Sequence, residues 1–432
     1  MRHAAARTLP FALILATTSA GVPGGHAVQA PQCAPDNGGI TLPDGFCAVV
    51  VADGLSRPRH MVVRSDGTLF VATYGGRRGG PAGGVVALRD TTGDGRADVR
   101  VRFGPDAGGS GMALQGDDLY FGTDEEILRY RVPAGALRPD GAGVVVVRDL
   151  PAAPGHRAKS LVVHGHDLFV NIGSPSNSCQ EQDRTNRSPG KDPCPELETR
   201  AGIWRFDAGR EGQTESDGQR YATGMRNTVA LALDPANGQL YGVIHGRDQL
   251  AQNWPALYTL QQGAELPAEE FVRIRQGSDF GWPYCYYDWH TGRKVLAPEY
   301  GGDGGRTVGR CADKDMPLVG FPGHWAPDGL LFYSGTQFPA SFRGGAFIAF
   351  HGSWNRAPMP QQGYKVVFVP FRDGAPTGTG TTFAGGFAGP DVSPNGAEHR
   401  PVGLALGPDG SLYVSDDAGG RIWRIVYRPG RR

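Results

Sequence analysis

The chain has 432 residues, including 67 glycines and 34 prolines, and it carries 43 basic and 43 acidic side chains. This length exceeds what one compact core usually serves, unless the core is distributed over repeated units. The charge balance gives no basic field for nucleic acid and no acidic field for cations, so we expect no nucleic-acid partner. Abundant glycine without long helical periodicity favours turns and strands.

The first 30 residues are typical of a secretory signal peptide. Arg2 and Arg7 precede a mostly apolar stretch, residues 9–22, and Val28 and Ala30 would lie at −3 and −1 of a cleavage site. The stretch is too short to span a bilayer. We therefore expect a mature chain of residues 31–432 that is periplasmic or secreted, with no membrane span.

A turn followed by an apolar run recurs along the mature chain. Six copies are present, at residues 65–71, 116–121, 164–170, 235–241, 327–333 and 408–414. A turn that needs Gly or Asn for positive φ and feeds a half-buried strand is typical of β-hairpins. The spacing of roughly 50 residues, widening later in the chain, predicts an all-β, six-bladed β-propeller with long insertions in its second half. An ordinary β-sandwich is the alternative.

The six cysteines fall into pairs that are close in sequence. An exported chain would oxidise them, and no Cys-x-x-Cys spacing favours a metal site instead. Sequence-close pairing predicts three disulfides: Cys33 with Cys47, Cys179 with Cys194, and Cys285 with Cys311.

Residues 90–98 contain the first part of a calcium loop. Oxygen-bearing side chains stand at its first, third, fifth and ninth positions and Gly95 at the sixth, but Val101 replaces the bidentate Glu at the twelfth. We favour a turn in which the Asp side chains bind their own backbone, with weak calcium binding as the alternative.

His156 precedes a predicted strand at residues 161–163. The next strand, 167–172, leads into a small polar loop at 173–179 that could approach a ligand closely. His156 is therefore either a functional side chain or a solvated loop histidine.

A second candidate site lies around the predicted strand 229–233. Arg226 and Asn227 precede it, and its partner strand ends at Gly246 and Arg247. The guanidinium offers a fork for a carboxylate, and a bend at the glycine could present backbone carbonyls to a cation. A surface ion pair and a plain turn are the alternatives.

The predicted strand 346–350 leads into a segment that suits a planar anionic ligand. It places an imidazole at His351, an indole at Trp354 and a guanidinium at Arg356 on one strand exit. Lys365 and Arg400 add cations at two further strand ends. The alternative is a buried Trp with solvated neighbours.

Together these segments resemble the soluble quinoprotein sugar dehydrogenases, and within them the sorbosone or pyranose dehydrogenase branch. The resemblance covers nearly the whole mature chain. It is carried by residues 155–156, 173–177, 226–227, 280–283, 351–356 and 400–403. It implies a six-bladed propeller with pyrroloquinoline quinone (PQQ) and Ca²⁺ at one end of the central channel.

The resemblance also implies a role for each site residue. His156 matches the general base, and the carbonyls of Gly246 and Arg247 match calcium ligands, although the glucose branch has proline where this chain has Arg247. The remaining matches are to cofactor contacts: Arg59, Arg226, Asn227, His351, Trp354, Lys365 and Arg400.

We therefore expect a PQQ-dependent oxidoreductase that oxidises the hydroxyl or hemiacetal carbon of a sugar (aldose, pyranose or sorbosone) by hydride transfer to the quinone. No Cys-x-x-Cys-His haem motif and no Gly-x-Gly-x-x-Gly dinucleotide motif occurs in the required context, so an external electron acceptor is expected. The alternatives are a calcium-dependent propeller lactonase and a non-catalytic propeller that binds sugars or proteins.

Overall fold

The computed structural model describes residue 1 and residues 31–76 and 81–430. The expected signal peptide lies outside the described residues, apart from Met1. The described residues form seven β-sheets, six of which are the blades of the predicted six-bladed propeller, while the seventh is a two-stranded hairpin in an insertion. No helix in the described residues is long and apolar enough to cross a membrane.

The first three blades follow the chain in order. Blade 1 consists of β2 (Pro58–Val63), β3 (Leu69–Thr73), β4 (Gly84–Arg89) and β5 (Val99–Phe103). Blade 2 consists of β6 (Gly111–Gln115), β7 (Asp118–Gly122), β8 (Ile127–Arg131), β9 (Val144–Arg148) and the short β13 (Gln213–Thr214). Blade 3 consists of β10 (Leu161–His164), β11 (Asp167–Ile172), β12 (Gly202–Asp207), β14 (Gln219–Thr223) and the short β18 (Ser278–Asp279).

The last three blades contain the longer insertions and the ring closure. Blade 4 consists of β15 (Ala230–Leu233), β16 (Leu240–Ile244), β17 (Glu269–Ile274) and β21 (Val319–Phe321). Blade 5 consists of β22 (Pro327–Phe332), β23 (Gly345–Phe350), β24 (Lys365–Arg372), β25 (Ala375–Pro376) and β26 (Thr381–Ala384). Blade 6 combines β27 (Pro401–Leu406), β28 (Leu412–Asp416) and β29 (Ile422–Tyr427) with β1 (Phe46–Ala52), so the two ends of the propeller share one sheet.

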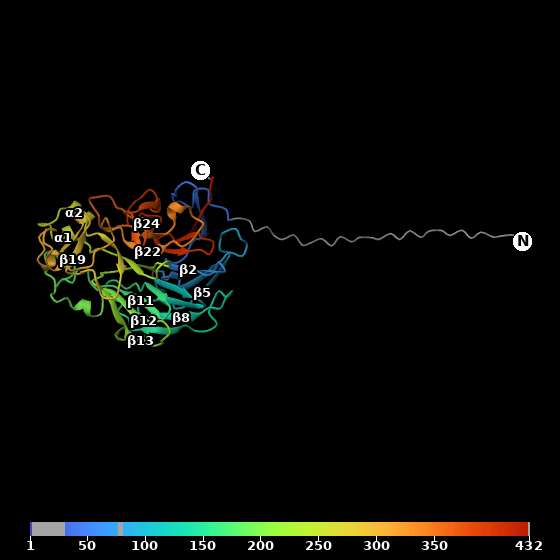
Figure 1. The fold of residues 1–432 in the computed structure, drawn as a ribbon, viewed down its shortest axis with the longest axis horizontal. Coiled ribbons are helices and arrows are strands. Elements are labelled where there is room, and N and C mark those ends of the chain that lie inside the picture. Colours follow the sequence, from blue (N-terminus) through green and yellow to red (C-terminus); the bar gives the residue numbers. More distant parts are fainter. Residues whose placement is uncertain (2–30, 77–80, 431–432) are drawn as a thin grey trace.

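Two insertions pack against one another on one side of the propeller. The insertion in blade 4 carries the helices and the hairpin at the left of Figure 1. It contains α1 (Leu250–Asn253), α2 (Leu260–Glu265), β19 (Cys285–Asp288), β20 (Arg293–Leu296), η3 (Pro298–Tyr300) and η4 (Gly309–Cys311). The blade 3 insertion contains η1 (Pro195–Glu198), and η2 (Glu215–Asp217) and η5 (Ala340–Phe342) are isolated turns of 3-10 helix elsewhere.

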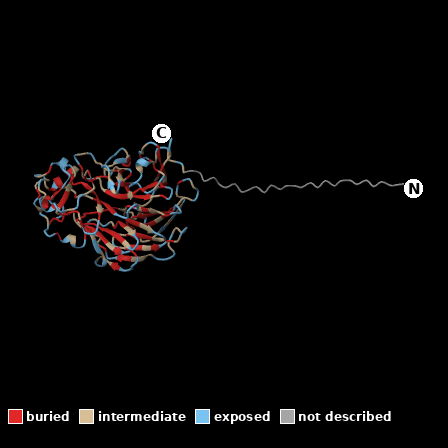
Figure 2. Cartoon of the chain, in the orientation of Figure 1, coloured by how far each residue is buried: buried red, intermediate tan, exposed pale blue. Residues whose placement is uncertain are grey.

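The apolar side chains form a separate core cluster between each pair of neighbouring blades. For example, Phe70 packs with Phe121 between blades 1 and 2, while Trp423 packs in the cluster between blades 5 and 6. Six such clusters close the ring, which is why burial in Figure 2 follows the strands and exposure follows the loops. Hydrophobic burial is thus distributed over repeats, as the chain length requires.

The predicted turns are confirmed in five of the six copies. Their glycines have positive φ and each turn leads into the second strand of its blade: Gly67, Gly116, Gly165, Gly238 and Gly410. The copy at residues 327–333 is different. It contains the whole of the first strand, β22, with Asp328 buried, and residues 333–344 make the connection to β23. The prediction of a turn was therefore wrong there, because an Asp-Gly pair also suits a strand bulge where the sheet bends.

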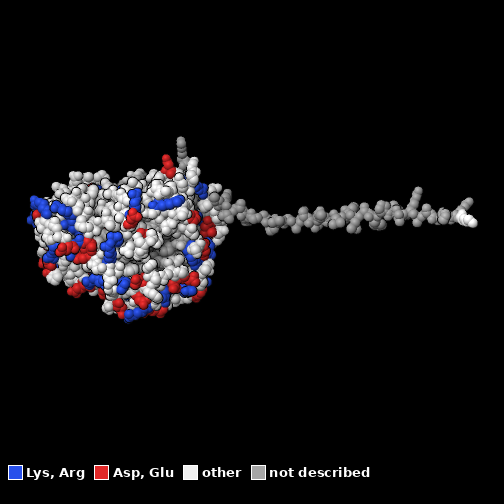
Figure 3. Space-filling model, in the orientation of Figure 1, with Lys and Arg blue, Asp and Glu red and all other residues white. Residues whose placement is uncertain are grey.

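The inner strands β2, β6, β10, β15, β22 and β27 line the central channel, each beside the next around the ring. Their side chains enclose a mostly apolar cavity of about 350 Å³. Basic and acidic residues alternate over the outer surface with no field of one sign on the face in view (Figure 3), as the equal charge totals predict.

Candidate functional site

All ten predicted site residues lie at one end of the channel, where the inner strands begin and the second strands end. We call this end the entry face. Antiparallel pairing brings these strand ends together from blades that are far apart in sequence. The site residues from the sequence are Arg59, His156, Arg226, Asn227, Gly246, Arg247, His351, Trp354, Lys365 and Arg400.

The imidazole of His156 is held in a single orientation. Its Nδ1 lies 2.9 Å from the carbonyl oxygen of Ser174 and 3.1 Å from the hydroxyl oxygen. A carbonyl only accepts, so Nδ1 carries the proton and donates it, which leaves Nε2 with its lone pair free to accept one. Burial lowers the pKa of His156 to about 3, with the positive charge of Arg226 adding to the effect.

Two glycines make room for this loop. A Cβ on Gly173 would lie 2.6 Å from the Cβ of His156, and one on Gly155 would lie 2.4 Å from the carbonyl oxygen of Pro175. The small residues of the 173–179 loop are therefore needed for its close approach to His156.

Arg226 is buried and committed to protein acceptors. Its Nη1 donates to the carbonyl of Gly246 at 2.9 Å, its Nη2 to the carboxylate of Asp248 at 2.8 Å and to the amide oxygen of Asn177 at 3.0 Å. Asn227 follows it, buried on the same loop. Arg226 thus shapes the site by joining two strand exits, and its contact with a cofactor remains a prediction.

Asp248 is the centre of this contact network, and its place at a strand exit was the one local signal that could have identified it. Its carboxylate accepts from Arg226, from Arg184 at 2.9 Å and from the amide of Asn355 at 2.9 Å. Burial would raise the pKa of Asp248, but the positive charge of Arg226 and of other neighbours holds it well below its usual range. Through Asn355, Asp248 fixes the loop that carries Trp354.

The turn at Gly246 and Arg247 presents two carbonyls. The amide of Gly246 donates to buried Glu269 at 2.9 Å, and its carbonyl accepts from Arg226. The carbonyl of Arg247 has no protein donor among the described residues. Carbonyl oxygens suit a hard cation such as Ca²⁺, but two are too few, so further oxygens must come from a ligand or water.

A chain of ion pairs crosses the mouth of the channel around Arg59. Its Nη1 lies 2.6 Å from Asp417 and its Nη2 3.2 Å from Asp328. His351 Nε2 lies 2.7 Å from the other oxygen of Asp417, and His245 Nε2 lies 3.3 Å from the other oxygen of Asp328.

The burial of this chain shifts the pKa of its members. Burial would lower the pKa of Arg59, but Asp328 and Asp417 raise it further than burial lowers it. Burial would raise the pKa values of the two aspartates, but their positive neighbours lower them by more than burial raises them. The charge of Arg59 is therefore neutralised by protein carboxylates. The sequence analysis identified neither Asp328 nor Asp417 as its partner.

Two of the cations predicted on the side of blades 5 and 6, Lys365 and Arg400, have no carboxylate partner in the described part of the chain. The prediction that Arg356 faces a ligand is wrong, because its guanidinium is buried and pairs with Glu265. Lys365 Nζ lies 3.6 Å from the ring centre of Trp325, and Arg400 donates to the carbonyls of His351 and Gly352 at 3.1 and 2.6 Å. Burial lowers the pKa of Lys365 to about 8, and Arg356 adds to the effect. A half-buried ammonium without an anion suits the carboxylate of a ligand.

Trp354 is 52% exposed. This is not the buried indole of the alternative interpretation. An exposed indole can stack against a ring-shaped ligand.

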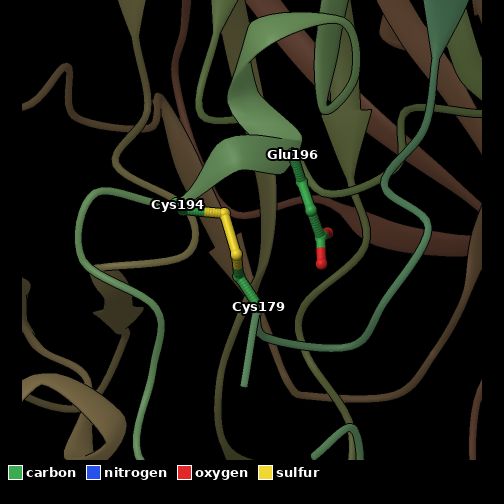
Figure 4. Close-up of side chains that lie close together, drawn as sticks. All are labelled: Cys179, Cys194 and Glu196. Atoms are coloured by element: carbon green, nitrogen blue, oxygen red, sulfur yellow. A yellow bond between two sulfur atoms is a disulfide. The ribbon is translucent and has the colours of Figure 1, made fainter. Parts of the chain in front are cut away.

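The three predicted disulfides are confirmed: Cys33–Cys47, Cys179–Cys194 and Cys285–Cys311. Within the described residues, one group of His, Cys, Asp or Glu side chains is compact enough to suggest a metal centre: Cys179, Cys194 and Glu196. Figure 4 shows that the two sulfurs of this group are bonded to each other. The group is therefore a disulfide beside a carboxylate.

The loop at residues 90–98 has the geometry of the favoured turn. The carboxylate of Asp90 accepts from the amides of Gly93 and Gly95, each at 2.7 Å, and that of Asp98 accepts from Thr91. These backbone donors use the oxygens that a calcium ion would need.

A family model described as TrAA12-like matches residues 40–428. The chain belongs to the TrAA12-like family. The resemblance noted in the sequence is thereby confirmed, because relatives in the comparison carry the names of quinone-dependent sugar dehydrogenases.

Two relatives illustrate the range of similarity. The pyrroloquinoline quinone-dependent sugar dehydrogenase of Hypocrea jecorina is 25% identical, over 91% of this chain and 92% of that protein. The pyrroloquinoline quinone-dependent pyranose dehydrogenase of Coprinopsis cinerea is 30% identical, over 47% of this chain and 30% of that protein. The matched part of the chain spans less than half the length of the first curated relatives, 48% of an uncharacterized protein from Borreliella burgdorferi and 30% of the Coprinopsis protein.

Two solved structures share the fold. The calcium structure of the family AA12 enzyme of Trichoderma reesei has a TM-score of 0.73 at 22% identity and covers 90% of this chain and 97% of its own. The holo form of the PQQ domain of Coprinopsis cinerea pyranose dehydrogenase has a TM-score of 0.71 at 20% identity, over 92% of this chain and 98% of its own. At these identities the similarity establishes the propeller and nothing finer.

Proposed function

We propose that this TrAA12-like chain is a PQQ-dependent dehydrogenase that oxidises the hydroxyl or hemiacetal carbon of a pyranose or related sugar at the entry face. One observation carries the proposal: an imidazole with a free lone pair at His156 shares this face with a cation at Lys365 that lacks an anion. The names of the relatives supply the class of cofactor and substrate.

The residues fit the two groups that the family implies. Lys365 and Arg400 would bind carboxylates of the quinone, Asn227 and His351 would contact its polar edge, and the carbonyls of Gly246 and Arg247 would bind Ca²⁺. Arg59, whose charge is already paired with two aspartates, would line the site without offering a free charge, and Trp354 would contact the ring. When bound, the quinone supplies the carbonyl that accepts hydride and the cation acts as a Lewis acid beside it.

The protein itself supplies orientation and a base. His156 Nε2 accepts the proton of the sugar hydroxyl, while the carbonyl of Ser174 holds the Nδ1 proton and stabilises the imidazolium that forms. A lowered pKa keeps His156 neutral at neutral pH, so the base is present without prior deprotonation.

We also propose export to the periplasm or cell exterior, supported by three disulfides and the signal-like N-terminus, and reoxidation by an external electron acceptor.

The lactonase alternative needs acidic and amide ligands gathered at one metal. Among the described residues, the compact ligand group is a disulfide with one carboxylate.

An experiment can separate the dehydrogenase from a non-catalytic sugar-binding propeller. Purified protein is given PQQ and Ca²⁺, then a panel of aldoses, pyranoses and sorbosone, with an artificial dye as electron acceptor. Dye reduction that requires sugar, quinone and protein together supports the proposal. Sugar binding without any quinone binding would support the non-catalytic propeller instead.

A further inference from the structure

A buried ion pair joins Arg247, in the turn whose carbonyls we propose as cation ligands, to Glu299 of η3. Arg247 Nη1 lies 2.5 Å from Glu299 Oε1, with 4% of the Arg side chain and none of the Glu side chain exposed. Nothing in the proposed chemistry uses either charge. Removing two charges from water carries a desolvation penalty. A pair kept in spite of this penalty indicates that it fixes a particular geometry.

Glu299 is bound from three directions. The same Oε1 also accepts from the indole of Trp254 at 2.9 Å and from the hydroxyl of Ser178 at 3.3 Å. The backbone carbonyl of Glu299 accepts from the amide of Gly190 at 3.0 Å. These contacts join η3 and α1 of the blade 4 insertion to the blade 3 insertion, and we call the two packed insertions the cap.

The Arg247 side chain also acts on its own turn. Its Nε donates to the carbonyl of Asp248 at 3.1 Å, and Asn177 holds that same carbonyl at 2.9 Å and the Asp248 amide at 2.8 Å. The amide and the carbonyl of Asp248, the residue after Arg247, are therefore both held by side chains. Among the described residues, no donor binds the carbonyl oxygen of Arg247.

At position 247 an arginine leaves the backbone more freedom than a proline would, because proline fixes φ. A turn that holds its carbonyl in one direction therefore needs a restraint from a side chain. The ion pair to the cap provides it. We propose that the Arg247–Glu299 pair positions the Arg247 carbonyl for a divalent cation and couples cation binding to the packing of the cap. This inference rests on the proposed function, because it assumes the cation site at Gly246 and Arg247.

The test compares calcium affinity in single variants. Titration calorimetry measures Ca²⁺ binding to the full chain with PQQ present, for the wild type and for Glu299→Gln, Arg247→Met and Arg247→Lys. We expect a loss of about 10- to 100-fold in calcium affinity for Glu299→Gln and Arg247→Met, as for other residues that orient metal ligands. Arg247→Lys should recover part of the affinity, because it restores the charge without the planar fork.

The matched control is Arg310→Met. Arg310 pairs with Asp192 at 2.6 Å and also bridges the two insertions, but both side chains are exposed and neither touches the turn. This variant should keep the calcium affinity of the wild type. Circular dichroism establishes that each variant is folded at the temperature of titration, and Glu299→Gln decides the matter if Arg247→Met does not fold.

Two results would overturn the inference and are distinguishable from each other. Wild-type calcium affinity in folded Glu299→Gln would show that the pair does not position the carbonyl, with the proposed function intact. No calcium binding by the wild type with PQQ present would remove the cation site itself, and the inference with it.

Discussion

His156 illustrates how the fold sets the properties of a single side chain. From the sequence, an imidazole with an ordinary pKa near ~6.5 was expected to accept a proton around neutral pH. Burial instead lowers the pKa of His156 to about 3, while its bond to Ser174 leaves the lone pair on Nε2. The imidazole is therefore a weaker base than expected, but it is neutral and oriented. We expect its rate contribution to come from this orientation and not from a high proton affinity.

We predict that His156→Ala binds PQQ but oxidises sugars at least roughly a hundredfold more slowly, because loss of a positioned base costs about 10² to 10⁴ in rate. Steady-state dye reduction on cofactor-saturated protein measures the effect. His166→Ala, on an exposed hairpin turn at the opposite end of blade 3, is the control and should behave as the wild type. Near-wild-type turnover of His156→Ala would place the base elsewhere, with His351 the next residue to test.

A second prediction concerns stability at acid pH. His60 donates to the carbonyl of Asp328 at 2.8 Å, and burial lowers its pKa to about 4. Between about pH 6.5 and pH 4 the unfolded chain binds a proton at His60 that the folded chain does not, so stability falls as pH falls through this window.

His60→Gln removes that proton from the unfolded state. We expect urea unfolding to show a shallower loss of stability from pH 7 to 4.5 in this variant, by roughly 2 kcal/mol. His156 contributes in the same direction in both proteins and so cancels in the comparison. Parallel stability curves for variant and wild type would contradict the assignment.

The residues that sequence reasoning missed are those whose partners are distant in the chain. Arg59 was a candidate, but Asp328 and Asp417 lie 269 and 358 positions away from it, and no local pattern marks either. Asp328 was instead interpreted as part of a turn. Local patterns located the polar residues that begin or end each strand, whereas their pairing depends on how the blades close.

At the scale of elements, the six recurring copies predicted the number of blades, although the copy in blade 5 is a strand and not a turn. A positive-φ glycine before an apolar run identifies the first hairpin of a blade wherever that hairpin is short. Blade 5 escaped this pattern because residues 333–344 replace the tight turn. The insertions were predicted from the wider spacing, but their helices and mutual packing were not, because they lack a long periodic segment.

Two disulfides allow a matched test of the cap. Cys33–Cys47 and Cys179–Cys194 close loops of nearly equal length, 14 and 15 positions, so loss of either should lower the free energy of unfolding by about 3 kcal/mol. We expect only the Cys179→Ala/Cys194→Ala variant to weaken PQQ binding, because Asn177, a partner of Arg226, lies two positions before Cys179. Calorimetry and urea unfolding measure both quantities. Equal PQQ affinity in the two double variants would show that the cap does not shape the site.

At the scale of the whole molecule, the propeller gathers into one face groups that come from most of the chain. The charges of that face are of two kinds. Around Arg59 and Asp248 they are paired within the protein, whereas Lys365 keeps its charge for a ligand. This division would allow a chain with balanced overall charge to bind the proposed anionic cofactor.

Quinone and calcium should therefore bind jointly. The protein offers two carbonyls at Gly246 and Arg247, too few for calcium without oxygens from the cofactor, so the affinity for either should rise when the other is present. Titration calorimetry with and without a chelator tests this coupling. Tight PQQ binding that the chelator leaves unchanged would contradict it.

The most direct test of the proposed function is the absorption spectrum of the reconstituted protein. Purified chain is mixed with PQQ and Ca²⁺, unbound cofactor is removed, and the spectrum of the retained quinone is recorded before and after a pyranose is added without any acceptor. We predict that the protein retains the quinone and that sugar converts its spectrum to that of the reduced form, which an added dye reverses. Folded protein that retains no quinone, or a retained quinone that no sugar of the panel reduces, would contradict the account.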